Sequence, residues 1–186
     1  MNEAFVSNDM HVSMSWVDKA KSIIESLLPG WKIVAIEGKD DEICRILDIN
    51  CGIDYLLCSP KSSLAFGLAS RVQYDHNYRT FSIRSKRDSG AKTEYEKRKV
   101  AIAVNALIPI YTMQIYIEDN QISGLAIAKT IDILEFIERG YAIKMKTSPS
   151  KKGQAEFYVC EWDMMKSLGY TVLEYDKQER SDNHAS

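Results

Sequence analysis

Apolar positions near the start of the chain recur at helical spacing. Between Trp16 and Leu28 they fall every three or four residues, which places them on one face of a helix. Pro29-Gly30 follows as a stop signal. The pattern therefore predicts a helix that ends here, and a loose segment over residues 1–12 before it.

The pattern then changes to short runs of Ile, Val, Leu and Tyr, separated by polar or glycine-containing turns. Runs of this length and composition are typical of strands. We expect them to form an antiparallel meander behind the first helix. The predicted strands span residues 31–37, 43–49, 53–58, 64–74 and 80–85.

A second helix is predicted from Thr93, because Thr93 and Glu96 have the spacing of a capping box. Further elements are expected at 111–118 (strand), 130–140 (helix), 156–162 (strand), 163–169 (helix) and 170–175 (strand), with a flexible basic loop at 142–153. The polar tail, residues 176–186, is predicted to be disordered. The prediction is thus one α/β domain over residues 13–175, with a mixed sheet built on an α-β-β-β-α-β core.

Composition places the chain among ordinary globular proteins: 186 residues, 45% hydrophobic and 27% charged. The start has neither the basic nor the apolar region of a signal peptide, and Asn105 and Pro109 interrupt the most apolar stretch. Four cysteines without a Cys-x-x-Cys pair and three scattered histidines argue against structural zinc and favour reduced thiols. We therefore expect a cytoplasmic protein that does not contact a membrane.

Charge is distributed unevenly. Residues 71–99 contain nine Lys or Arg against four acids, a local +5 in a chain of net −2. Such asymmetry marks either a polyanion-binding surface or a solvated face.

Two aspartates bracket the turn in "DINCGID", residues 48–54. If residues 50–52 form a hairpin loop, Asp48 and Asp54 lie opposite each other with Cβ atoms about 5 Å apart. Carboxylates that close repel each other unless a cation is bound, and Mg²⁺ prefers such oxygen ligands. A solvated turn would hold the same two acids without a metal, so both interpretations stay open.

On the next run, strand alternation places Ala69, Arg71 and Gln73 on one face. Arg71 either pairs with Asp54 as a structural ion pair or neutralises charge on a phosphate.

The order helix, meander, helix, strand resembles the PD-(D/E)xK nuclease superfamily, whose fold is restriction-endonuclease-like. The motifs that carry this resemblance are Gly-Ile-Asp (52–54) at the start of one strand and Ala-Ser-Arg (69–71), followed by Gln73, on the next. The resemblance covers residues 13–118.

The resemblance implies a metal-dependent phosphodiesterase that uses Mg²⁺ (or Mn²⁺). Asp54 would be the first metal ligand, and Arg71 would replace the lysine that positions the attacking water. Ala69 occupies the place of the second acid. The groups that would compensate are Asp48, Gln73 or Glu94 as ligands and Lys97 as a catalytic cation on the neighbouring helix.

Under this hypothesis the basic segment binds DNA, in preference to RNA, largely independently of sequence. The expected contacts are Arg79, Arg84, Lys86, Arg87, Lys92, Arg98 and Lys99. A homodimer would allow both strands to be cut. Because Ala69 lacks a carboxylate, the alternative is a catalytically inactive nucleic-acid- or protein-binding module of the same fold. A third interpretation is an interaction protein whose basic segment binds an acidic partner.

Overall fold

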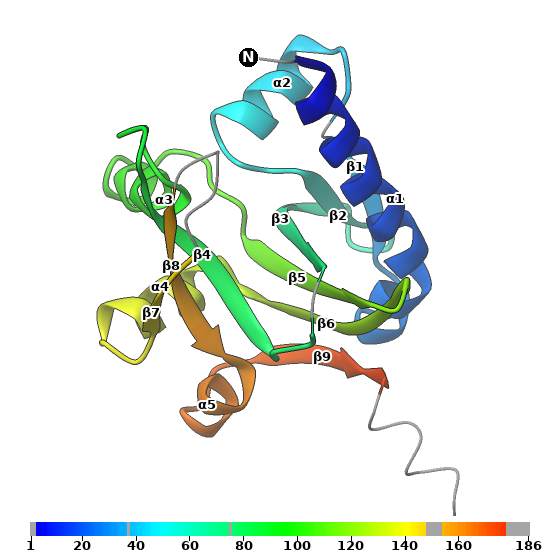
Figure 1. The fold of residues 1–186 in the computed structure, drawn as a ribbon. Coiled ribbons are helices and arrows are strands. Elements are labelled where there is room, and N and C mark those ends of the chain that lie inside the picture. The colour runs from blue at the N-terminus through cyan, green and yellow to red at the C-terminus, as the bar shows by residue number, and fades with distance from the viewer. Residues whose placement is uncertain (1–2, 37, 75, 148–153, 178–186) are drawn as a thin grey trace, which may run out of the picture.

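The computed structural model describes residues 3–36, 38–74, 76–147 and 154–177, with the backbone alone for residues 3–14. Five helices and nine strands are assigned in these ranges (Figure 1). In chain order they are α1 (Glu3–Leu27), β1 (Lys32–Ala35), α2 (Glu42–Ile49), β2 (Tyr55–Ser59), β3 (Leu64–Tyr74), β4 (Thr80–Arg87), α3 (Glu94–Ala103), β5 (Tyr111–Glu118), β6 (Gln121–Lys129), α4 (Thr130–Glu138), β7 (Ile143–Lys146), β8 (Ala155–Glu161), α5 (Trp162–Ser167) and β9 (Val172–Asp176).

The strands of the described residues form two sheets. The larger has the order β1-β2-β3-β5-β6-β9, in which β3 and β5 are parallel and every other pair is antiparallel. The smaller is antiparallel, in the order β4-β8-β7. The chain leaves the larger sheet after β3, forms β4 and α3, and returns as β5 beside β3.

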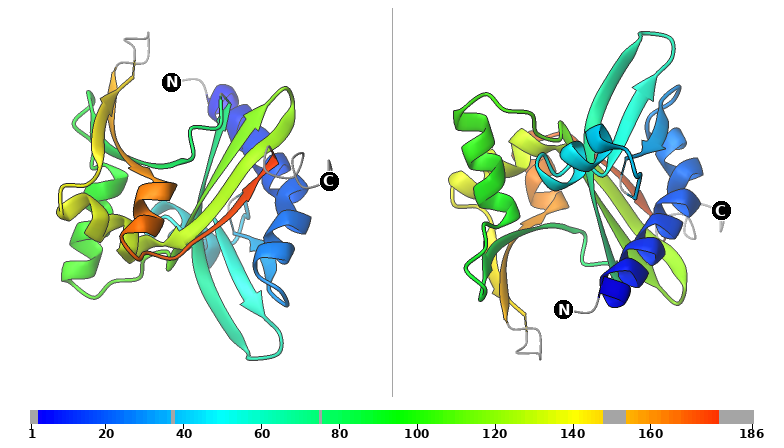
Figure 2. Two further views of the ribbon diagram at one scale, coloured as in Figure 1. Left: turned by 90° about the horizontal axis from the view of Figure 1, so that it is seen from below. Right: turned by 90° about the horizontal axis from the view of Figure 1, so that it is seen from above.

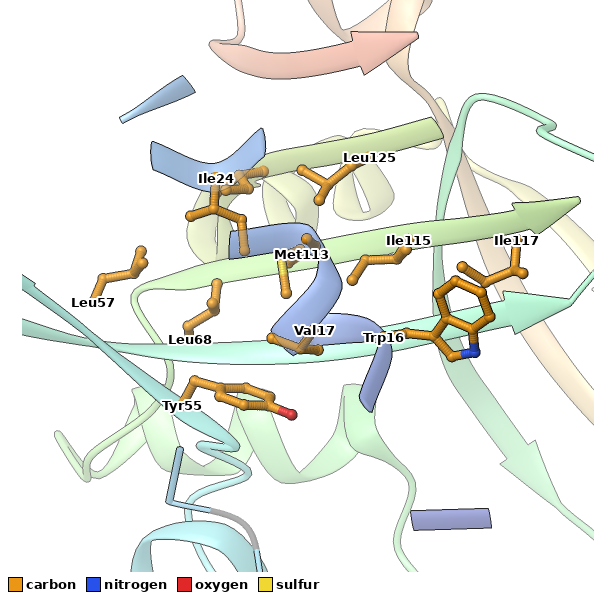
Figure 3. Close-up of a cluster of buried hydrophobic side chains, with 12 residues drawn as sticks. Trp16, Val17, Ile24, Tyr55, Leu57, Leu68, Met113, Ile115, Ile117 and Leu125 are labelled. Carbon is orange, nitrogen blue, oxygen red and sulfur yellow. The ribbon is translucent and has the colours of Figure 1, made fainter. Parts of the chain in front are cut away.

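Helix α1 covers one face of the large sheet. Its buried residues Trp16, Val17 and Ile24 follow the helical spacing read from the sequence. Figure 3 shows them against side chains of β2, β3, β5 and β6, namely Tyr55, Leu57, Leu68, Met113, Ile115, Ile117 and Leu125. Burial of this apolar area ties the helix to the sheet.

The small sheet packs on the opposite side of the large one, together with α3, α4 and α5 (Figure 2). Alternation along β4 and β8 directs Phe81, Ile83 and Cys160 into this second core, where they meet Tyr116 of β5 and Phe136 of α4. On the other face of the small sheet, Ile143 and Met145 of β7 are exposed.

The predicted fold class is confirmed, because the chain is mixed α/β. When α2 and β4 are set aside, α1, β1, β2, β3, α3 and β5 follow one another in the predicted α-β-β-β-α-β order. The predicted meander is wrong at β4, which pairs with β8 in the small sheet and not with β3. The capping box at Thr93 and Glu96 is present. Strand β6 was not predicted, and β7 lies within the segment expected to be a loop. Helix α1 begins at Glu3, inside the segment expected to be loose.

The predicted strand at 43–49 is wrong, because these residues form α2. Asp41 caps the helix by accepting a hydrogen bond from the backbone N–H of Cys44 at 3.0 Å. After the helix, Gly52 takes a φ of +67°, a conformation that favours glycine. Residues 48–54 are therefore a helix end leading into β2, and Asp48 does not oppose Asp54 across a hairpin.

No helix in the described part of the chain is long and apolar enough to cross a membrane. The predicted disordered tail lies outside the described residues from 178 onward.

Candidate functional site

A pocket of about 240 Å³ is lined by the end of α2, the residues directly before β2, the middle of β3 and helix α3. It brings together eight of the charged residues singled out in the sequence. The acids are Asp48, Asp54 and Glu94, and the cations are Arg71, Arg87, Lys92, Lys97 and Arg98. We call it the cationic pocket, because its charged side chains sum to +2.

Backbone hydrogen bonds hold Asp54 directly before β2. Its N–H donates to the carbonyl of Leu68 at 3.0 Å, and its carbonyl accepts from the N–H of Ile36 at 2.9 Å. The carboxylate turns toward β3, where Oδ2 accepts a hydrogen bond from the N–H of Ser70 at 2.6 Å. This bond ties Asp54 to the middle of β3, where Arg71 pairs with Glu94.

Asp48 reaches the same pocket from the last turn of α2, by a route the sequence did not predict. Burial raises the pKa of its carboxyl group above the usual value.

Glu94 is held between two arginines. Its Oε2 lies 2.8 Å from Nη2 of Arg71, and its Oε1 lies 2.6 Å from Nη2 of Arg98. Arg98 is 4% exposed and also donates from Nη1 to Oγ1 of Thr112 at 3.3 Å. Burial alone would raise the pKa of Glu94, but Arg98 and Arg71 outweigh it and lower the pKa, so the carboxylate stays ionised.

The remaining cations of the pocket are exposed. Nζ of Lys97 lies 3.5 Å from the carbonyl oxygen of Ile49 at the end of α2. The last carbonyl groups of a helix have no partner within the helix and accept such contacts. Within the described ranges, Arg87, Lys92 and Lys97 form no salt bridge with a carboxylate. Their charge is therefore available to an anion in the pocket.

Four predicted nucleic-acid contacts lie outside the cationic pocket, and three of them, Arg79, Lys86 and Lys99, pair with carboxylates. Arg79 is surrounded by Asp163, Glu174 and Asp176, all within hydrogen-bonding distance of its guanidinium group. Lys99 pairs with Glu138 at 3.0 Å. Lys86 lies 3.9 Å from Glu156.

Gln73 and Arg84 lie outside the cationic pocket but close to it. Gln73 lines a neighbouring groove that also includes Arg71. Arg84 is half-buried, and burial followed by repulsion from Arg71 and Arg87 lowers its pKa. Its guanidinium carbon lies 5.4 Å from the ring centroid of Phe157, and that of Arg71 lies 5.2 Å from the same ring. Phe157 was not singled out in the sequence, where it is one apolar position of a predicted strand.

The three predicted metal ligands line one pocket, yet their arrangement does not fit a Mg²⁺ centre. Both oxygens of Glu94 already accept from arginine, and one oxygen of Asp54 accepts from Ser70. Among residues 3–36, 38–74, 76–147 and 154–177, no group of three or more His, Cys, Asp or Glu is positioned to hold a metal ion. The folded site is better suited to an anion than to a divalent cation.

Comparison with known proteins yields no relative: no family model, no curated protein and no solved structure matches the chain.

Proposed function

We propose that this protein binds nucleic acid through the phosphate backbone at the cationic pocket, as a nuclease-derived module. The observation that carries the proposal is the convergence of five cations from β3, the end of β4, the following loop and α3 on one concavity. In the sequence these five cations belong to one basic run, residues 71–99. In the fold, other members of the run, such as Arg79 and Lys99, form ion pairs outside the pocket.

The pocket contains two kinds of cation. Arg71 and Arg98 are fixed by Glu94 and by the surrounding strands, so they present rigid guanidinium groups. Arg87, Lys92 and Lys97 stand at the exposed side, where they would meet a phosphate oxygen without first breaking a salt bridge. Arginines that position a phosphate, together with exposed cations that add charge, are typical of sequence-independent backbone contacts.

The fold supports the same proposal. Two features resemble PD-(D/E)xK nucleases: the order helix, three strands, helix and strand that remains when α2 and β4 are set aside, and the placement of Asp54 directly before β2 with Arg71 on the adjoining β3. We extend the proposal to a restriction-endonuclease-like fold, DNA as the ligand, a cytoplasmic location and a homodimer. The four cysteines are all free thiols, as a reducing compartment would keep them.

Metal-dependent cleavage is the second candidate function. It is favoured by the three carboxylates that line the pocket together, Asp48, Asp54 and Glu94. It would require Glu94 to leave its two arginines, since both of its oxygens are engaged.

The test of binding compares two lysines two positions apart on α3. Lys97 faces the cationic pocket, whereas Lys99 pairs with Glu138 on α4. Lys97→Ala should weaken binding of a labelled DNA several-fold and lower the salt slope by about one unit. Lys99→Ala removes the same charge from the same helix and should leave both quantities unchanged. Equal effects of the two variants would show that DNA is attracted only by the net charge of the protein, and this result would contradict the proposal.

Cleavage is tested by incubating plasmid and single-stranded DNA with the protein in Mg²⁺, Mn²⁺ or EDTA. Cutting that requires metal and disappears in a folded Asp54→Ala variant would establish the second candidate. Binding without cutting in any metal would support the first candidate, which is binding of the phosphate backbone without cleavage.

A further inference from the structure

A second concavity adjoins the cationic pocket. This groove, of about 600 Å³, lies between the polar face of β3 and the open face of the small sheet. Arg71 lines both concavities. The volume of the groove is within the range of roughly 300–1,000 Å³ found for small-molecule sites.

The register of the small sheet explains the chemistry of the groove. Phe157 pairs with Met145 and Arg84, and Val159 pairs with Ile143 and Ser82, so these side chains form two cross-strand rows on one face. The opposite face of β4 and β8 is the one buried in the second core. The groove thus has an apolar, aromatic floor, and Ile143 and Met145 remain more than half exposed there, at 53% and 55%.

Polar groups stand at the β3 side of this floor. Gln73 projects an amide from the strand that also carries Arg71, and Ser82 adds a hydroxyl from β4. Behind Ser82, Gln114 is 1% exposed and accepts from the Ser82 hydroxyl at 3.2 Å. In the described part of the chain its Nε2 has no hydrogen-bond partner, although a buried donor is costly to leave unpaired.

We propose that this groove binds an unstacked nucleobase whose phosphate occupies the cationic pocket, so that the ligand is single-stranded DNA. This inference rests on the proposed function. Phe157 lines the groove, and the guanidinium carbon of Arg71 lies 5.2 Å from the centroid of its ring at the junction of the two concavities. A base can stack on the aromatic ring or on the guanidinium plane. Gln73 and Ser82 offer the donors and acceptors that a base edge requires. A base within a duplex is stacked and paired and would not enter.

The experiment compares three labelled ligands of equal length at one salt concentration: oligothymidylate, its duplex with oligoadenylate, and a strand with the same phosphates but no bases. The single strand should bind about tenfold more tightly than the base-free strand, because base stacking is lost in the latter. The duplex should bind no better than the base-free strand.

Phe157→Ala should remove most of the preference for the single strand and leave affinity for the base-free strand unchanged. Phe157→Leu keeps an apolar floor without an aromatic ring, and it should also reduce the preference for the single strand. Ile131→Ala is the matched control, because Ile131 is an exposed apolar residue on α4 outside the groove. The base-free strand also reports whether loss of the ring displaces Arg71.

The outcomes separate the two proposals. If all three ligands bind alike, or if the Phe157 variants weaken all three equally, the groove does not bind a base, while phosphate binding at the cationic pocket stands. If no ligand binds, both proposals are wrong.

Discussion

Two charge clusters in this protein are built from the same kinds of side chain but in opposite proportions. In the Glu94 cluster (Arg71, Glu94 and Arg98), one carboxylate lies between two arginines. In the Arg79 cluster (Arg79, Asp163, Lys166, Glu174 and Asp176), one arginine lies among three carboxylates, and Lys166 contacts two of them.

The difference lies in what surrounds each cluster. The Arg79 cluster joins β9 and the start of α5 to the turn before β4, and its surplus charge is negative. Hydrogen bonding to Asp163 and Asp176 and the charge of Glu174 raise the pKa of Arg79 despite its burial, as expected for a closed structural pair. The Glu94 cluster opens onto a pocket with three further cations. Under the proposed function, the Glu94 cluster positions its two arginines for an external anion, whereas the members of the Arg79 cluster pair with one another.

The largest effect is expected from Arg79→Ala. The change removes the arginine that pairs with Asp176, which is 7% exposed, and leaves Glu174, which is 16% exposed, with Lys166 as its cation. Loss of one partner from a mostly buried network should lower the free energy of unfolding by about 3 kcal/mol, measured by urea denaturation. Arg79→Lys, which keeps the charge but not the planar fork, should lose less.

DNA affinity of the folded Arg79→Ala protein should equal that of the wild type, because Arg79 lies outside the cationic pocket. A selective loss of affinity would place Arg79 on the binding surface after all, as the sequence suggested.

The second prediction concerns Glu94→Gln. Removal of the carboxylate charge leaves the buried Arg98 without its ion-pair partner, which should lower the free energy of unfolding by about 2 kcal/mol. The same change makes the pocket more positive. For a phosphate ~7 Å away in a water-like dielectric, the gain is about 0.6 kcal/mol, or roughly threefold in affinity.

The sign of this effect separates the two candidate functions. A backbone-binding site should bind DNA more tightly after Glu94→Gln when assayed at low salt. A cleaving site that depends on Glu94 should lose its activity. Weaker binding without any change in cleavage would contradict the first candidate.

Local sequence signals predicted the elements that local interactions determine. The capping box fixes the start of α3, and uninterrupted strand patterns gave the bounds of β3 and β5. Helix α2 was missed because its run of apolar residues also fits a strand, and only the Asp41 cap distinguishes the two. In β6, Gly124 interrupts the apolar pattern, and that strand was not assigned.

The site was predictable only in part, because the roles of its cations depend on distant partners. Arg79 and Lys97 belong to one basic run and carry the same charge. The carboxylates that engage Arg79 lie at positions 163, 174 and 176, brought near by the pairing of β9 with β6. Asp48 and Asp54 do share a pocket, but through a helix end and not through the predicted hairpin.

The smallest predicted effect concerns acid. Hydrogen bonds from Arg79 and Lys166 lower the pKa of Asp163 from 3.8 to about 2. A lowered folded-state pKa gives stability that is complete above the unfolded value and is lost as pH falls, here from about pH 4 to about pH 2. The contribution is small because the side chain of Asp163 is 66% exposed. Asp163→Asn should therefore flatten the dependence of unfolding free energy on pH in this window. Identical slopes for Asp163→Asn and wild type would show that Arg79 is held by Glu174 and Asp176 alone.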